Sequence, residues 1–236
     1  MPTAPRPIVA RQASRLLALA LALAALMLPS GTRAATTGCA NEVPNRPTVV
    51  LDPGHGGPSD TGTSNYGTLP DGTKVLLVEK DLTLDIAIRT RNILISAPYN
   101  YRVCLTRTSD IALTNTQRAQ YANSVSANVL VLIHLNGSSD HTVDYTQTFW
   151  GKKNKDQQFS AAIYNALFPA LGIPGHGVGQ FASGALLKSN MPATLAETVF
   201  LTNDNEANLL VDTGPSGNRR QQIATALAQG IHNWLR

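Results

Sequence analysis

Three features are missing from this sequence, and each absence excludes a class of protein. The longest apolar run, Leu16–Leu28, is shorter than the roughly 20 residues that a membrane-spanning helix needs. The glycine cluster at 54–57 is not followed by the Gly-Lys-Ser/Thr of a P-loop. A dinucleotide-binding loop would need a third glycine where Ser59 stands and a helix directly after it, but a long loop follows. Nucleotide binding at this cluster is therefore not expected.

A basic surface for nucleic acid is also missing once the N-terminus is set aside. The chain has 19 Lys and Arg residues against 15 Asp and Glu residues. Four of these basic residues precede position 34 and no acidic residue does, so subtracting them leaves 15 basic and 15 acidic residues. The four are Arg6, Arg11, Arg15 and Arg33. The remaining chain is formally neutral, and we expect no nucleic-acid partner.

The first residues have the pattern of an export signal. A basic start, a short apolar middle and the small-residue exit PSGTRA predict a secretory signal peptide over residues 1–34, cleaved after Ala34. An uncleaved membrane anchor is the alternative. Residues 35–46 are expected to form a linker, and residues 47–236 one domain with a full core.

Cysteine is scarce, with Cys39 and Cys104 the two present. In an exported protein such a pair favours a disulfide over a metal site. Two free thiols remain the alternative.

Strands and helices alternate along the rest of the chain. Apolar or alternating runs predict strands at 47–52, 75–78, 101–107, 128–136, 143–151 and 193–201, the fifth of them wet on one face. Helical spacing of apolar residues predicts helices over 79–97, around 117–121, over 159–171 and over 223–235, with 59–74 as a loop. This order predicts an α/β fold: a mainly parallel twisted sheet of about six strands with helices on both faces.

Two of the five histidines stand where such a sheet places its sites. His55 follows the first strand, and His134 lies near the end of the strand at 128–136. Ligands bind beyond the carboxyl ends of parallel strands, so both could hold a metal, although spacing alone leaves a structural role equally open. His141, His176 and His232 are expected to be structural or solvated.

Five segments resemble the zinc-dependent N-acetylmuramoyl-L-alanine amidases of amidase family 3. In chain order they are VVLDPGHGG, EKDLTLDIA, YRVCLTRTSDIALTNTQRAQYAN, NVLVLIHLN and NMPATLAETVFLTNDNEANLL. Together they extend from about Pro47 to the C-terminus. The resemblance is strong because all five occur in the family's order, although no single one is decisive.

The resemblance implies a function and a set of site residues. His55, Glu79 and His134 correspond to the family's zinc ligands, and Glu197 to its catalytic glutamate. One Zn²⁺ per chain is then expected, with hydrolysis of the peptidoglycan amide between the lactyl group of N-acetylmuramic acid and L-alanine. We expect a monomer without a stable membrane anchor, exported to the periplasm or the cell wall.

Alternatives remain open at both levels. Taken alone, Glu79 could be an acid that favours the first turn of a helix, and Glu197 could belong to a buried salt bridge. Another exported zinc peptidase or deacylase could use the same ligands, and a non-catalytic wall-binding protein is a further alternative. The sequence also departs from the family: Leu132 replaces a serine two residues before His134, and the stretch between His55 and Glu79 is longer than usual. We expect altered hydrogen bonding near the metal and an enlarged rim.

Overall fold

A seven-stranded sheet, in the order β1-β5-β2-β6-β9-β7-β8, forms the centre of the fold in the computed structural model. Its strands are β1 (Cys39–Ala40), β2 (Thr48–Pro53), β5 (Arg102–Leu105), β6 (Val129–Asn136), β7 (Thr146–Trp150), β8 (Gly175–Gln180) and β9 (Ala193–Phe200). Strands β5, β2, β6 and β9 are parallel neighbours. Strand β7 is antiparallel to β9 and parallel to β8, and β1 is antiparallel to β5. The predicted mainly parallel sheet is confirmed, with seven strands rather than about six.

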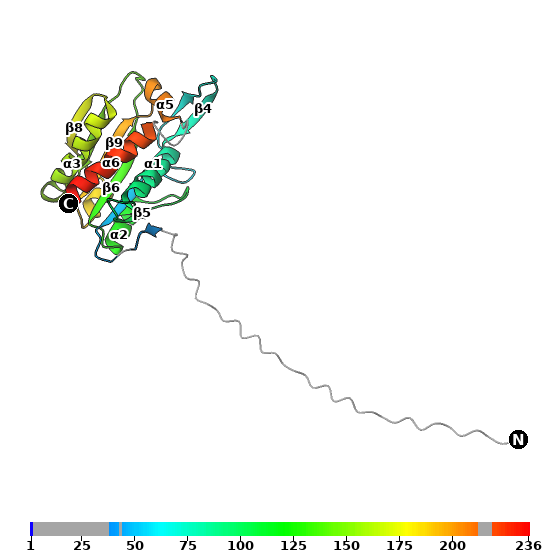
Figure 1. Cartoon of the computed structure of the whole chain (residues 1–236). Coiled ribbons are helices and arrows are strands. Elements are labelled where there is room, and N and C mark those ends of the chain that lie inside the picture. The colour runs from blue at the N-terminus through cyan, green and yellow to red at the C-terminus, as the bar shows by residue number, and fades with distance from the viewer. Residues whose placement is uncertain (2–37, 43, 212–218) are drawn as a thin grey trace. The chain divides into compact units, whose positions relative to one another are not determined.

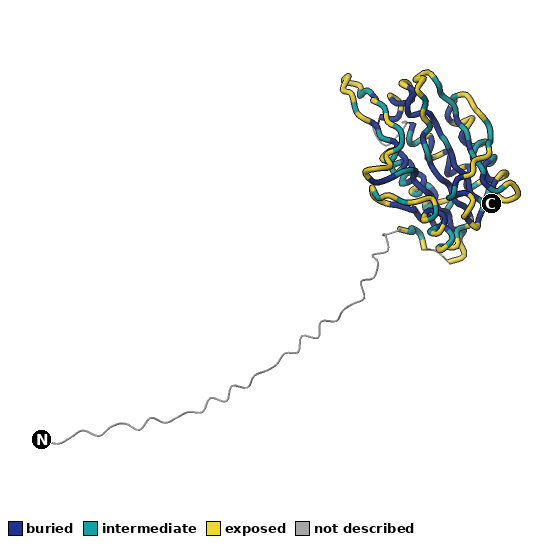
Figure 2. The backbone as a smooth tube through the Cα atoms, turned by 180° about the vertical axis from the view of Figure 1, so that it is seen from behind, coloured by how far each residue is buried: buried dark blue, intermediate teal, exposed yellow. Residues whose placement is uncertain are grey.

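The central strands are buried on both faces, which explains their continuous apolar sequences. Successive side chains of a strand point to opposite faces. Val49 and Leu51 of β2 accordingly pack into one core, and Val50 between them packs into a second core. Figure 2 shows the buried positions concentrated in the central strands, with exposed positions in the surrounding loops and outer elements.

Helices cover both faces, as predicted. Helices α1 (Glu79–Leu94), α3 (Lys153–Leu171) and α6 (Arg219–Leu235) pack in the core that contains Val49, and they lie in front of the sheet in Figure 1. Helices α2 (Asn115–Ser124) and α4 (Gly184–Lys188) contribute to the core that contains Val50. The site-bearing ends of the parallel strands therefore lie between two helical layers.

The expected loop at 59–74 is wrong for its second half. Strand β3 (Ser64–Thr68) pairs antiparallel with β4 (Lys74–Val78) in a separate two-stranded sheet. Gly72, at φ 86°, closes the turn by donating its N–H to the carbonyl of Leu69. The Pro70-Asp71-Gly72 sequence is a turn signal, so the predicted strand at 75–78 belongs to this hairpin and not to the main sheet.

Three further elements were not predicted from the sequence. Strand β8 contains three glycines, which have low strand propensity, and it forms through its pairing with β7. Helix α4 has only five residues. Helix α5 (Asp204–Leu210) begins at Asn203, whose side chain accepts hydrogen bonds from the N–H groups of Asn205 and Glu206.

The predicted disulfide is confirmed. Cys39 and Cys104 are bonded, and they are direct partners in the β1–β5 pairing. The bond links β1 covalently to its neighbouring strand β5.

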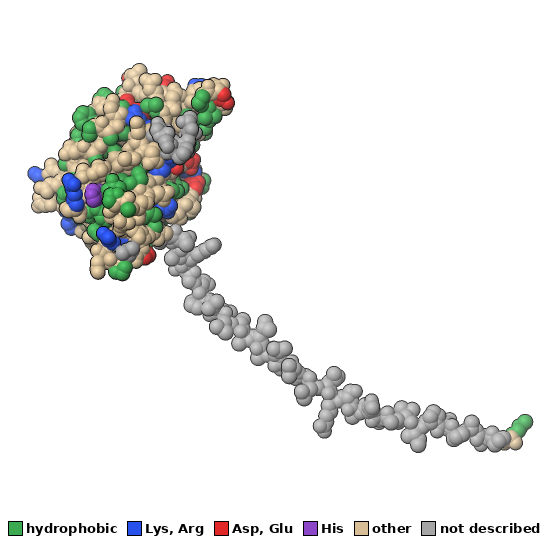
Figure 3. All heavy atoms as spheres, viewed as in Figure 1, with side chains coloured by type: hydrophobic (Ala, Val, Ile, Leu, Met, Phe, Trp, Pro, Cys, Tyr) green, Lys and Arg blue, Asp and Glu red, His purple; other side chains and the backbone are tan. Residues whose placement is uncertain are grey.

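The structure describes residues 1, 38–42, 44–211 and 219–236. The predicted signal peptide over 1–34 lies outside the described residues apart from Met1, and so do positions 35–37 and 43 of the predicted linker. Among the described residues, no helix is long and apolar enough to cross a membrane. On the face of Figure 3, Lys and Arg side chains lie in several separate places among apolar and uncharged atoms.

Candidate metal centre

The glycine cluster after β2 forms a sharp turn that presents His55. His55 has φ 60°, a left-handed conformation that costs free energy for a residue with a side chain, and Gly56 and Gly57 follow with φ 136° and 78°. A Cβ atom on Gly54 would lie 2.5 Å from Cε1 of His134. The glycines are thus required both for the turn and for the space around the second histidine.

Two buried arginines hold this turn through its carbonyl groups. Arg118 of α2 donates to the carbonyl of His55 at 2.9 Å. Arg107, after β5, donates to the carbonyls of Gly54 at 2.8 Å and Lys80 at 2.7 Å. Because a charge-assisted hydrogen bond is stronger than a neutral one, these contacts can offset the strain at His55.

Glu79 is the first residue of α1, and its buried carboxylate is fixed by two backbone groups. The N–H of Thr63 donates to Oε2 at 2.9 Å, and the N–H of Leu135 donates to Oε1 at 3.0 Å. A Cβ atom on Gly62 would contact this carboxylate and the ring of His55. The loop before β3 therefore packs directly on the site.

The three predicted ligands converge on one point. Oε1 of Glu79 lies 3.1 Å from Nε2 of His55 and 3.1 Å from Nδ1 of His134. One ligand atom from each residue lies within 4.8 Å of the others. Ligands held tetrahedrally about 2.1 Å from zinc are about 3.4 Å apart, so two imidazole nitrogens and one carboxylate oxygen fit a zinc ion here. The donor set leaves a fourth position for water or substrate.

The electrostatics show a carboxylate that requires a cation. Burial alone would raise the pKa of Glu79, but hydrogen bonds and charge from His134 and His55 lower it to about 2. Burial likewise opposes the charged form of His55, yet Glu79 and Asp60 together raise its pKa to about 9. The raised pKa of His55 favours a proton on the ring nitrogen that faces Glu79, where a metal ion would otherwise bind.

Asp60 is a site residue that the sequence did not reveal. Its Oδ1 lies 2.5 Å from Nδ1 of His55, so that Nε2 of the same ring faces Glu79. Carboxylates commonly orient metal-binding histidines in this way. Asp60 lies five residues after His55, in a loop rich in Ser, Thr and Gly. This loop has no helical or strand periodicity from which the role of Asp60 could have been predicted.

Glu197 lies beside the cluster on β9. It is the direct Cα partner of His134 across the parallel β6–β9 pairing. Its Oε2 is buried and has no hydrogen-bond partner among the described residues. Burial raises the pKa of Glu197 to about 7, with His134 opposing and Glu79 adding to the increase. The salt-bridge alternative is not supported, because no cationic side chain is paired with Glu197 in the described part of the chain.

The other three histidines are structural or solvated, as expected. His141 pairs with the exposed Asp204. Nδ1 of His232 shares a hydrogen bond with the hydroxyl group of Tyr101, and Nδ1 of His176 contacts the side-chain amide of Gln147.

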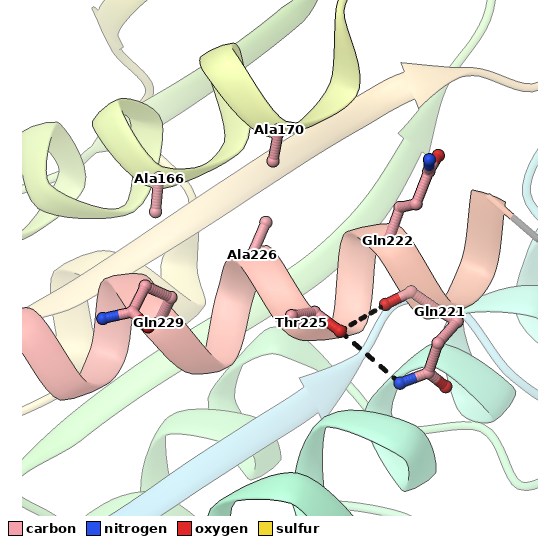
Figure 4. A pocket seen from close by; sticks show the side chains of 7 residues that line it. All are labelled: Ala166, Ala170, Gln221, Gln222, Thr225, Ala226 and Gln229. Carbon is pink, nitrogen blue, oxygen red and sulfur yellow. Dashed lines mark hydrogen bonds between the residues drawn. The ribbon is translucent and has the colours of Figure 1, made fainter. Parts of the chain in front are cut away.

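A hollow of about 220 Å³ opens next to the ligands. Its walls are His55, Asp60, Leu113, Asn115, Arg118, Leu132, His134, Phe181, Ser183 and Leu195. Leu132 presents apolar surface beside His134 where the family usually has a serine hydroxyl. A larger hollow of about 370 Å³ lies between α3 and α6, lined by alanine, threonine and glutamine (Figure 4). It contains none of the metal-binding or titratable groups described above.

Known proteins share this sequence and this fold. A family model described as N-acetylmuramoyl-L-alanine amidase matches residues 49–233. The amidase CwlM of Bacillus licheniformis is 33% identical over 184 residues, which are 78% of this chain and 66% of that protein. The amidase LytC of Bacillus subtilis (strain 168) is 30% identical over 190 residues, 78% of this chain and 36% of that protein. The chain thus spans less than two thirds of the length of either curated relative.

Solved structures agree with the sequence comparison. An N-acetylmuramoyl-L-alanine amidase from Clostridium difficile 630 superposes with a TM-score of 0.68 at 31% identity, covering 81% of this chain and 97% of the other. The catalytic domain of CwlV from Bacillus (Paenibacillus) polymyxa var. colistinus gives a TM-score of 0.67 at 28% identity, covering 80% and 98%. The family model covers residues 49–233, and the fold brings His55, Glu79 and His134 together within that span. This chain therefore belongs to the N-acetylmuramoyl-L-alanine amidase family 3.

Proposed function

We propose that this chain is a zinc-dependent peptidoglycan amidase that hydrolyses the bond between the lactyl group of N-acetylmuramic acid and L-alanine. His55, Glu79 and His134 hold one zinc ion per chain, and Glu197 is the catalytic acid–base. The enzyme acts as a monomer on the cell wall.

Zinc in this site supplies a Lewis acid that activates water and polarises a carbonyl group. The chain's own residues do the rest. Asp60 and the backbone N–H groups of Thr63 and Leu135 fix the orientations of His55 and Glu79, so little reorganisation is needed when substrate binds.

Glu197 moves the proton. Its carboxylate takes a proton from the attacking water and then delivers it to the nitrogen of the departing alanine, which leaves as a free amine. A carboxyl group whose pKa burial raises to about 7 can both accept and release a proton near neutral pH. The unpartnered Oε2 of Glu197 beside three converging ligand atoms is the observation that carries this proposal.

Export follows from the N-terminal pattern and agrees with the disulfide. Disulfides persist in oxidising compartments, and Cys39 and Cys104 are bonded. We propose cleavage after Ala34 and action outside the cytoplasm.

Mass spectrometry of digested peptidoglycan tests the reaction. We expect peptides that begin with a free L-alanine amine, and glycan chains whose lactyl groups end in a newly formed carboxylate. A chelator abolishes both products and added zinc restores them. Peptides cut at another bond, or deacetylated sugars, would instead indicate a different zinc peptidase or deacylase.

A further inference from the structure

Strands β9, β7 and β8 present a half-exposed face that continues outward from the metal centre. Gln147 of β7 is the direct partner of Glu197, and Phe149 is the direct partner of Leu195. Both β7 side chains are half-buried, whereas Thr146 and Thr148 on the opposite face are buried. The prediction that one face of this strand is exposed to solvent is confirmed. The exposed face is on the same side of the sheet as Glu197.

A glycine keeps this face flat. Gly179 of β8 pairs with Phe149, and a Cβ atom there would lie 2.9 Å from the ring of Phe149 and 3.2 Å from Nε2 of Gln147. Without a side chain at position 179, the ring of Phe149 and the amide of Gln147 stay half-exposed, and the amide also contacts the ring and the carbonyl group of His176.

An aromatic ring joins this face to the metal hollow. The ring of Phe181 lies 5.9 Å from that of Phe149 and is 51% exposed. The same side chain lines the hollow that contains His55 and His134. Its backbone is held on both sides, because its N–H donates to Trp150 and its carbonyl accepts from Ser183. We define the sheet shelf as Gln147, Phe149, Gly179, Phe181 and Leu195.

The chemistry of the sheet shelf suits the uncharged rings and amide groups of a ligand and not its charged groups. None of its five residues carries a charge, so it offers no arginine or lysine of the kind that recognises the carboxylates of a stem peptide. It offers aromatic and aliphatic surface together with one amide. Pyranose rings have apolar C–H faces that gain free energy by covering aromatic rings, and an amide can exchange hydrogen bonds with hydroxyl and N-acetyl groups.

We propose that the sheet shelf binds the glycan strand, with a sugar ring packed on Phe181 and Phe149 and with Gln147 hydrogen-bonded to its polar substituents. This inference rests on the proposed function, since it places the sugar side of the scissile amide over β9 and β7. The stem peptide then leaves on the other side of the metal. Phe181 and Gln147 are specificity residues for the glycan.

Binding of glycan chains already freed of stem peptides tests the proposal, because these chains contain no bond to hydrolyse. The probe is a tetrasaccharide of alternating N-acetylglucosamine and N-acetylmuramic acid, titrated calorimetrically into the zinc-loaded protein. Phe181→Ala should weaken its binding about tenfold or more, and Gln147→Ala severalfold. Phe168→Ala is the matched control, since Phe168 is 44% exposed on α3 at the opposite face and should leave the affinity unchanged.

Other results overturn the proposal. Undetectable binding of the tetrasaccharide at millimolar concentration, or equal affinities for wild type and Phe181→Ala, would contradict it. So would a Phe181→Ala variant that loses affinity for free stem peptide and not for the glycan. Zinc content and circular dichroism establish that each variant is folded. Because no hydrolysis is involved, glycan binding that depends on Phe181 would stand even if the amidase reaction were absent.

Discussion

His134 of β6 and Glu197 of β9 are direct partners on neighbouring parallel strands. The spacing between the proposed metal ligand His134 and the proposed catalytic residue Glu197 is therefore fixed by backbone hydrogen bonds within a buried sheet, not by a loop. Sites on such rigid elements hold their geometry more accurately than sites on loops. The part of the site that depends on loops is the side of His55, which follows β2 and is held by Asp60 and by Arg118.

Asp60 orients His55, so replacing it should weaken metal binding. We expect Asp60→Asn to reduce zinc affinity by about 10- to 100-fold, with activity recovered at high zinc concentration. Competition with a chromophoric chelator measures the affinity. Asp71→Asn is the control, because Asp71 is an exposed turn residue bonded to Thr73. Equal zinc affinities for wild type and Asp60→Asn would contradict the role.

Zinc affinity should rise with pH. The pKa of His55 is raised to about 9, so below that pH a proton occupies His55 and must leave when zinc binds. The apparent affinity should increase by up to about tenfold per pH unit as the pH approaches 9. An affinity that stays constant between pH 7 and 9 would show that no proton is displaced.

The stability of the metal-free protein should fall as the pH rises. A raised pKa for His55 stabilises the fold fully below its ordinary value of about 6.5, and this stabilisation is lost as pH rises through about 9. Urea unfolding of the chelator-treated protein should show this decline, and zinc-loaded protein should show less of it.

Crowding at the site can be separated from backbone strain by comparing two glycines. Gly62 and Gly72 both have positive φ, 69° and 86°. A Cβ atom on Gly62 would lie 2.7 Å from Cδ2 of His55, whereas one on Gly72 would contact nothing within 4 Å. We expect Gly62→Ala to lose zinc, and Gly72→Ala to be destabilised by about 1 kcal/mol or slightly more while keeping zinc. Equal zinc content in both variants would refute the crowding.

The Cys39–Cys104 disulfide should contribute to stability and not to chemistry. It closes a separation of 65 residues, for which the chain-entropy model gives about 4 kcal/mol. The double variant Cys39→Ser/Cys104→Ser should unfold at lower urea concentration, yet retain wild-type turnover at temperatures where it stays folded. Loss of zinc from the folded double variant would contradict this separation.

The elements that the sequence predicted are those whose side chains pack on both faces of the sheet or along one helical stripe. The β-branched and leucine-rich strands β2, β6 and β9 are examples, because burial dictates their composition. Strand β8 was not predictable in this way, since its glycines pack little and its pairing with β7 determines its conformation. The hairpin turn at 70–72 and the helix start at Asn203 carried local patterns that do predict them.

The site residues likewise differ in how far the sequence could predict them. His55, Glu79, His134 and Glu197 were identified through motifs in the family's order, and the fold brings them together. Asp60 and Phe181 were not identified, because both lie in irregular segments whose positions depend on tertiary contacts. Asp60 reaches His55 only through the turn at Gly56 and Gly57, and Phe181 reaches the hollow through the end of β8.

Turnover and zinc content of Glu197→Gln, measured together on purified peptidoglycan, test the central claim most directly. Glu42→Gln is the control, because Glu42 is an exposed acid paired with Arg102. We predict that Glu197→Gln keeps about one zinc per chain and loses release of stem peptides by about 10²-fold or more, while the control retains both. Release of stem peptides at the wild-type rate by zinc-loaded Glu197→Gln would contradict the account.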